Sequence, residues 1–216
     1  MRGSVASLSR ESPSREVLRR ASRLVSSGGI LLYPSDTVYG LLCDATAPDS
    51  VRRLAALKGY SGIRPFIVLV SGLDQALRMA RFSKTALLLA ERFWPGPLTL
   101  VAPATSQVPS HLRNELEEIA LRSPADPISQ GILELAARPL VSTSANLGGG
   151  AHAHSVCDVP ASVRAHCGLV LDGGEISAER LPSTVARAGP EGLEILREGA
   201  LPSTDLKGRA PERFRD

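Results

Sequence analysis

One run of five apolar residues, FIVLV at positions 66–70, constrains the fold of this chain more than any other feature. A strand with water on one side alternates apolar and polar residues, whereas a strand covered on both sides is apolar throughout. The run is typical of the second kind, so its sheet needs a layer on each face. Helices supply such layers in mixed sheets, and we therefore expect helices packed on both sides.

Amphipathic segments alternate with short apolar runs along the chain, in agreement with this expectation. In the first segment Ser12 is a candidate N-cap, Pro13 takes the first helical position, and Gly28 ends the helix. The other predicted helices lie at 49–58, 73–80, 83–93 and 126–137, and the other predicted strands at 30–33, 98–102, 118–122, 139–142, 168–171, 183–187 and 193–197. This order predicts an α/β (α+β) fold: a single-domain, twisted, open mixed sheet with flanking helices.

Composition excludes several classes of protein. The chain has 216 residues, 43% of them hydrophobic, which suffices for one compact domain with a full core. Three widely spaced cysteines do not make a disulfide scaffold, and no N-terminal stretch resembles a signal peptide, so we expect a cytoplasmic protein. No run approaches the roughly 20 apolar residues that cross a bilayer, so we expect no membrane partner. A net charge of +3 permits an anionic ligand or a nucleic acid without requiring either.

Two clusters of small polar residues follow predicted strands, the place where open sheets commonly bind ligands. The first, PSDT, comes directly after ILLY and contains Ser35, Asp36 and Thr37. The second, STSANLGGG, joins three hydroxyl groups and Asn146 to a glycine run. Such a loop lets polar groups approach a phosphate and its Mg²⁺ closely, although the spacing is neither that of a Walker loop nor a Rossmann fingerprint. Both clusters are also compatible with ordinary turns.

Positive charges stand at the ends of predicted elements. Lys58 ends a predicted helix, and Arg122 and Arg197 each end a short apolar strand. Because a guanidinium group pairs bidentately with carboxylate or phosphate, two such arginines favour an anionic ligand. Each of the three taken singly is also compatible with a solvated surface charge.

Eight motifs occur in the order and at the spacing of a known family, over about residues 14–201. They are YPSDTVYGLLCDA, LKGYSGIRPFIVLV, FWPGPLTLV, IALRSPADP, PLVSTSANLGG, LDGG, LPSTV and ILREGAL. On these motifs the chain resembles the YrdC-type domain family, and within it the threonylcarbamoyl-AMP synthases in their short, single-domain form. The resemblance implies a YrdC-like catalytic domain, which we place at 12–204. Residues 1–11 are polar and rich in serine and arginine, so we expect a flexible leader there, and we expect a C-terminal tail at 205–216.

The resemblance also implies a reaction. Such a nucleotidyltransferase joins L-threonine, bicarbonate or CO₂, and ATP into L-threonylcarbamoyladenylate and releases pyrophosphate. A tRNA threonylcarbamoyl transferase then uses the product to modify an adenosine next to the anticodon. Mg²⁺ enters as a cofactor bound with ATP. This chemistry requires two anions to be held together, a task for lysine, arginine and Mg²⁺ rather than for a nucleophile.

Roles for single residues follow from the same motifs. The resemblance places Ser35, Arg122 and Ser183 on the threonine, with Arg122 at the carboxylate. It implies the following nucleotide-binding residues: Lys58, Thr143, Ser144, Asn146, Ala151 and Arg197. Of these, Lys58, Ser144 and Asn146 are the expected catalytic residues. We expect Lys58 and Arg122 to face a cavity rather than to pack in the core. His152, His154 and Cys157 lack the paired spacing of zinc sites, so no side-chain metal cluster is predicted.

Two positions differ from the usual pattern of the family. Tyr60 stands where the Lys-x-Arg motif has its arginine, and Leu69 stands where many members have a histidine. A lost charged contact to a phosphate costs about 1.5–3 kcal/mol, which predicts a weaker enzyme rather than an inactive one. Arg64 lies four residues after Tyr60 and is a candidate to compensate.

Two other functions remain open at this point. One is a non-catalytic module that binds double-stranded RNA or tRNA, which the loss of the arginine at Tyr60 would suit. A dedicated RNA binder carries a more basic surface than a net charge of +3 indicates. The other is carbamoyl transfer to a different acceptor. Retention of Ser35, Arg122 and Ser183 favours threonine over that acceptor.

Overall fold

Ten strands form one sheet in the computed structural model, which describes residues 4–61, 65–189 and 192–207. The strands are β1 (Ser4–Ser7), β2 (Leu31–Pro34), β3 (Tyr39–Asp44), β4 (Ile67–Leu69), β5 (Leu98–Pro103), β6 (Glu118–Arg122), β7 (Leu140–Ser144), β8 (Leu169–Asp172), β9 (Thr184–Gly189) and β10 (Gly192–Arg197). Their order across the sheet is β1-β8-β2-β3-β7-β4-β6-β5-β9-β10. Four neighbouring pairs are parallel and five antiparallel, so the sheet is mixed, as predicted.

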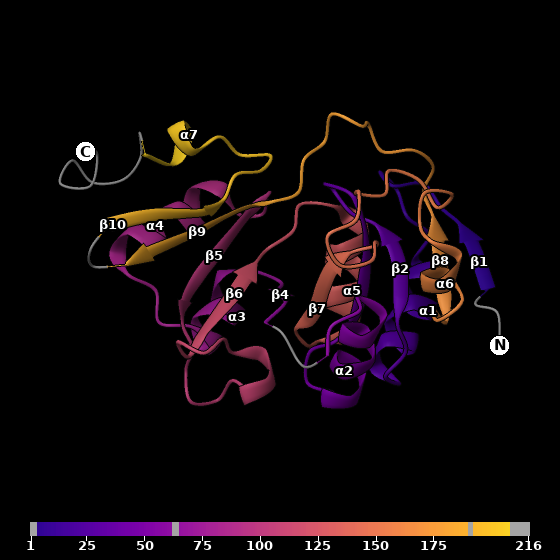
Figure 1. Cartoon of the computed structure of the whole chain (residues 1–216), viewed down its shortest axis with the longest axis horizontal. Helices are drawn as coiled ribbons and strands as arrows, with labels where there is room; N and C mark the ends of the chain where they lie inside the picture. The colour runs from indigo at the N-terminus through magenta and orange to yellow at the C-terminus, as the bar shows by residue number, and fades with distance from the viewer. Residues whose placement is uncertain (1–3, 62–64, 190–191, 208–216) are drawn as a thin grey trace.

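Helices connect and cover the strands. They are α1 (Arg15–Ser26), α2 (Pro48–Leu57), α3 (Leu73–Met79), α4 (Lys84–Phe93), α5 (Pro127–Ala136), α6 (Ala161–Arg164) and α7 (Ser203–Lys207), together with a 3₁₀ turn at Ser110–Leu112. The segment between β8 and β9 crosses the top of the molecule from one half of the sheet to the other (Figure 1). It brings Ser183 to the sheet half that contains β5 and β6.

The apolar run 66–70 has a packed layer on each face, as predicted, although Ile67 is only partly buried. Val68 packs into a cluster with residues of α2 and α3, whereas Leu69 packs on the opposite side with residues of α1 and α5. Alternation along a single strand thus divides the core into two layers, because successive side chains of a strand point to opposite faces.

Two helices lie close together on the Leu69 face. At Gly131 of α5, an added Cβ atom would lie 2.6 Å from Cδ1 of Leu18 in α1. The missing side chain therefore lets the two helices approach each other, and buried residues of both pack on β2, β3, β7 and β8. One half of this sheet face is closed in this way.

Strand register extends the same face to the other half of the sheet. Leu69 lies opposite both Leu140 and Arg122, and Ile67 lies opposite Ser142. Opposed residues share a face, so polar side chains of β6 and β7 point to the same side as α1 and α5, beyond the edge of those helices. A site can form there.

Several boundaries differ from the sequence predictions, and β3 lies where no strand was predicted. Helix α1 begins at Arg15 after the N-cap residue Ser14, two residues later than predicted. Residues 4–7 are not a loose leader, because they form β1 and pair in parallel with β8. The C-terminal boundary at 204 cuts α7, whose Leu206 is fully buried against α4 and β9. Short segments of this kind acquire structure only from the surface that they contact.

Candidate active site

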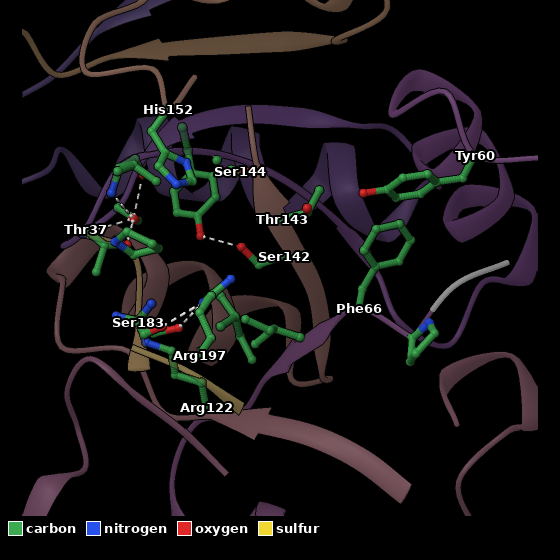
Figure 2. A pocket seen from close by; sticks show the side chains of 18 residues that line it. Thr37, Tyr60, Phe66, Arg122, Ser142, Thr143, Ser144, His152, Ser183 and Arg197 are labelled. Atoms are coloured by element: carbon green, nitrogen blue, oxygen red, sulfur yellow. Dashed lines mark hydrogen bonds between the residues drawn. The ribbon is translucent and has the colours of Figure 1, made fainter. Parts of the chain in front are cut away.

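A cavity of about 400 Å³ opens over the uncovered half of the sheet face. Its walls come from the turn between β2 and β3, from β4, β6 and β7, and from the ends of β9 and β10. It is lined by Tyr33, Ser35, Thr37, Val38, Gly40, Tyr60, Pro65, Phe66, Ile67, Leu69, Arg122, Ser142, Thr143, Ser144, His152, Pro182, Ser183 and Arg197. Figure 2 shows Tyr60 and Phe66 on one side and Arg122, Ser183 and Arg197 on the other. An aromatic wall thus faces a cationic wall.

Most of the predicted site residues meet in this cavity. Those that line it are Ser35, Arg122, Thr143, Ser144, Ser183 and Arg197. Lys58, Asn146 and Ala151 are not among the lining residues. Strands far apart in the sequence supply the lining, so the convergence depends on the topology of the sheet.

The side chain of Arg122 is buried and is already paired with the carboxylate of another residue. Its Nη2 lies 2.6 Å from both carboxylate oxygens of Asp36, and its Nε donates a hydrogen bond to the carbonyl of Gly96 at 3.0 Å. The side chains of Arg122 and Asp36 are only 7% and 13% exposed. No role for Asp36 follows from the sequence, because nothing local in PSDT indicates a partner 86 residues away.

Arg197 is fixed at the neighbouring wall. It donates to the carbonyl of Ser183 from Nη2 at 2.8 Å and from Nε at 3.2 Å, and the Ser183 hydroxyl lies 2.9 Å from that of Thr99. Partial burial, followed by the charge of Arg122, lowers the pKa of Arg197. The two guanidinium groups repel each other electrostatically. This wall of the cavity is therefore suited to an anion, because an anion relieves the repulsion.

Lys58 contradicts the expectation that it faces a cavity. Only 3% of the residue is exposed, and its ammonium group donates to the backbone carbonyls of Ser144 at 2.8 Å and Asn146 at 2.6 Å, as well as to Oδ1 of Asn146. Burial lowers its pKa to about 8. A helix-end lysine is usually solvated, but here the loop after β7 folds around it. Lys58 therefore fixes the backbone of the STSAN loop.

The β2–β3 turn is held by its own hydroxyl groups. The Oγ atom of Ser35 donates to the carbonyl of Val38 at 2.6 Å and accepts from the backbone N–H groups of Thr37 at 3.1 Å and Val38 at 3.2 Å. Ser35 thus lines the cavity and also shapes the turn that carries Asp36. The residues of PSDT therefore form an ordinary turn and also line the candidate site, so both interpretations of this motif apply.

Several lining residues were missed by sequence reasoning. The Tyr33 hydroxyl lies 3.0 Å from Oγ of Ser142, which is two positions before Ser144 on β7. The period of two in a strand places Ser142 and Ser144 on one face, and this signal was available in the sequence. His152 also lines the cavity, and partial burial together with the charge of Arg197 lowers its pKa.

Both departures from the family pattern lie at the cavity. Tyr60 and Phe66 have ring centroids 6.3 Å apart, and Leu69 forms part of the apolar floor. Arg64, the candidate to compensate for Tyr60, lies outside the described residues. Within residues 4–61, 65–189 and 192–207 no group of three or more His, Cys, Asp or Glu side chains could hold a metal ion.

An arginine-lined cavity beside a glycine-rich loop on a mixed sheet is the class of site that suits small anions. The family model for Sua5, YciO and YrdC, described as telomere recombination, matches residues 23–199. The chain therefore belongs to the Sua5/YciO/YrdC family.

Relatives and solved structures agree with this assignment. A threonylcarbamoyl-AMP synthase of Pyrococcus abyssi is 32% identical over 191 residues, which cover 88% of this chain but 56% of the relative. One of Xanthomonas campestris is 33% identical over 86% of this chain and the full relative. P. abyssi Sua5 complexed with L-threonine matches 96% of this chain and 62% of that chain, at 31% identity and a TM-score of 0.87.

Another structural match shows the fold alone. E. coli YciO has a TM-score of 0.85 at 23% identity and covers 94% of this chain and 99% of that chain. Among the described helices of this chain none is both long and apolar enough to cross a membrane.

Proposed function

We propose that this chain is a threonylcarbamoyl-AMP synthase, which condenses L-threonine, bicarbonate or CO₂, and ATP into threonylcarbamoyl-AMP and pyrophosphate. The observation that carries the proposal is the cavity in which Arg122, Arg197, Ser183 and the hydroxyl groups of β7 converge. Relatives named for this activity and the Sua5 complex with L-threonine support it.

The reaction needs two steps that place anions side by side. The amine of threonine adds to CO₂ and loses a proton, which gives a carbamate. An oxygen of the carbamate then attacks the α-phosphorus of ATP, and pyrophosphate leaves. Little covalent chemistry falls to the protein, which must position the reactants and offset their charge. Guanidinium groups and hydroxyl donors at fixed positions are suited to both tasks.

Each wall of the cavity has a part in this proposal. Arg122 would bind the threonine carboxylate, with Ser35 and Ser183 near the rest of the amino acid. Thr143, Ser144 and Arg197 would contact the nucleotide. Leu69 and Phe66 are buried apolar side chains that exclude water from the reacting groups. A low local dielectric strengthens the charged contacts.

Lys58 and Asn146 have a different place in the proposal from the one their motifs imply. Oδ1 of Asn146 accepts hydrogen bonds from the Lys58 ammonium and, at 2.7 Å, from Oγ of Ser144. The pair therefore holds the loop that presents Ser144 to the cavity. Both residues would act on the nucleotide through this loop.

Mg²⁺ is proposed to enter with ATP. Ser144 lines the cavity, and its Oγ lies 3.4 Å from the Lys58 ammonium and donates to Oδ1 of Asn146. Asn146 does not line the cavity, and its Oδ1 also accepts from Lys58. The residues present fit a metal held mainly by phosphate and water oxygens, with Ser144 as the one member of this pair that lines the cavity. The ion would neutralise phosphate charge.

A partner for the product is part of the proposal. An acyl adenylate is reactive toward nucleophiles and is suited to transfer, so a tRNA threonylcarbamoyl transferase is the expected consumer. Direct binding of tRNA or double-stranded RNA by this chain is the alternative function, and Tyr60 in the cavity wall is the feature that keeps it open.

Pyrophosphate release from ATP by the purified protein tests the proposal. Threonine and bicarbonate are supplied together and then omitted in turn, and serine replaces threonine as the matched substrate. Release that requires both co-substrates and prefers threonine supports the synthase. Absence of release, with RNA bound at physiological salt, would instead indicate a binding module.

A further inference from the structure

Asp36 stands at a position that the reaction scheme leaves unexplained. Its carboxylate lies against Arg122, which the proposed function assigns to the carboxylate of threonine. A carboxylate that already occupies this guanidinium group has two opposite consequences. It either competes with the substrate or positions the arginine for it.

The surroundings of Asp36 distinguish these two roles. Its backbone carbonyl accepts a hydrogen bond from Nη1 of Arg180 at 2.6 Å, and its Oδ2 lies 3.3 Å from the backbone N–H of Ala125. Neighbouring Ser35 bonds the turn to itself at three points. The turn that carries Asp36 is thus fixed at its backbone, and the carboxylate is held by Ala125 as well as by Arg122, so Asp36 is not a displaceable occupant.

The contacts of Arg122 fit the positioning role. Nε is fixed on the carbonyl of Gly96 and Nη2 on Asp36, which leaves Nη1 without a hydrogen-bond partner among the described residues. Arg122 lines the cavity. Two of its three nitrogens are therefore used to orient the group, and the third is available to a ligand.

The charge of Asp36 also acts beyond this ion pair. Its carboxylate raises the pKa of the buried Asp126, after burial itself. It also offsets Arg122, whose charge lowers the pKa of Arg197. Asp36 therefore reduces the repulsion between the two cavity arginines.

We propose that Asp36 is a positioning residue for substrate recognition: it orients Arg122 so that the free edge of the guanidinium group binds the carboxylate of an amino-acid substrate. This inference rests on the proposed function and adds to it the residue that makes recognition of the carboxylate selective. Asp36 itself touches Arg122 and not the substrate.

The Asp36→Asn variant tests this role in the full-length chain. KM for threonine and KM for ATP are measured by pyrophosphate release, and the Kd of threonine is measured by calorimetry. Because hydrogen bonds to charged groups contribute strongly, threonine KM and Kd are expected to rise roughly 10- to 100-fold, with the KM for ATP within about twofold of wild type. Asp36→Ser, which removes the same charge, repeats the measurement if the Asn variant does not fold.

Three controls separate positioning from a general structural effect. Asp49→Asn removes an exposed carboxylate from Arg52 on α2 and should leave both KM values unchanged. L-Threoninol lacks the carboxylate, so its affinity should not respond to Asp36→Asn. In an Arg122→Gln background the Asp36 variant should add no further loss, because its effect acts through Arg122.

Each other outcome has a definite meaning. A lower threonine KM in Asp36→Asn would show a competing occupant and overturn the proposal, as would an unchanged KM. Equal losses for threonine and threoninol would also overturn it. Wild-type protein without threonine-dependent release would refute the proposed function instead, which keeps the two failures distinct.

Discussion

Replacement of Asp126 by asparagine should stabilise the protein near neutral pH. Asp126 is the N-cap of α5, where its Oδ1 accepts a hydrogen bond from the backbone N–H of Ser129 at 2.7 Å. The residue is 8% exposed, and its other carboxylate oxygen, Oδ2, has no partner among the described residues. Burial and the charge of Asp36 raise its pKa to about 6. Ionisation of Asp126 in the folded protein therefore lowers the free energy of unfolding.

The sign and size of the effect follow from proton linkage. Between about pH 4 and pH 6 the folded state keeps a proton that the unfolded state has released, so stability falls as pH rises through this window. The pKa of Asp126 differs by about two units between the folded and unfolded states, which corresponds to about 3 kcal/mol. Above pH 6 the free energy of unfolding is lower by this constant amount. Asparagine has nearly the same shape and caps helices equally well, but it carries no charge. We expect Asp126→Asn to gain about 2–3 kcal/mol at pH 7.

Urea unfolding of wild type and variant at pH 4, 5, 6 and 7 measures this prediction. The gain should shrink toward pH 4, where the wild-type carboxyl group is protonated in the folded state. Asp126→Ala is the matched control, since it also removes the charge but loses the cap, at a cost of about 1 kcal/mol relative to asparagine. A variant whose stability differs from wild type by the same amount at every pH would refute the reasoning.

Three further variants test the packing of the loop beside the site and of α7. Lys58→Met leaves buried oxygens of Ser144 and Asn146 without a donor, so the free energy of unfolding should fall by about 3 kcal/mol in denaturant titration. If Lys58 were a solvated surface residue, the same substitution would leave the free energy of unfolding unchanged. Gly148→Ala places a Cβ 2.7 Å from the carbonyl of Lys58 and should cost about 1–3 kcal/mol, with weaker ATP binding by calorimetry. Leu206→Ala should cost about 2–5 kcal/mol by thermal unfolding if α7 belongs to the folded domain, and the exposed neighbour Asp205→Ala should cost nothing.

Local sequence patterns predicted most elements of the sheet because strand and helix periods are properties of a short segment. The predicted strand 118–122 coincides with β6, and the predicted helix 73–80 differs from α3 by one residue. Strands β1 and β3 were not predicted. Ser4–Ser7 has no apolar pattern of its own and exists by pairing with β8, whereas Tyr39–Asp44 is apolar but follows directly on the polar turn PSDT. Segments without a period of their own depend on their neighbours.

Local sequence was enough to indicate which residues could serve an anion site: hydroxyl groups and arginines at strand ends, six of which line one cavity. It did not determine how these groups pair. The Asp36–Arg122 ion pair joins residues 86 positions apart, and the loop around Lys58 joins residues 86 to 88 apart. Such contacts depend on the order and register of ten strands, which no local pattern encodes. Residue types follow from the chain, whereas their distances and burial follow only from the tertiary fold.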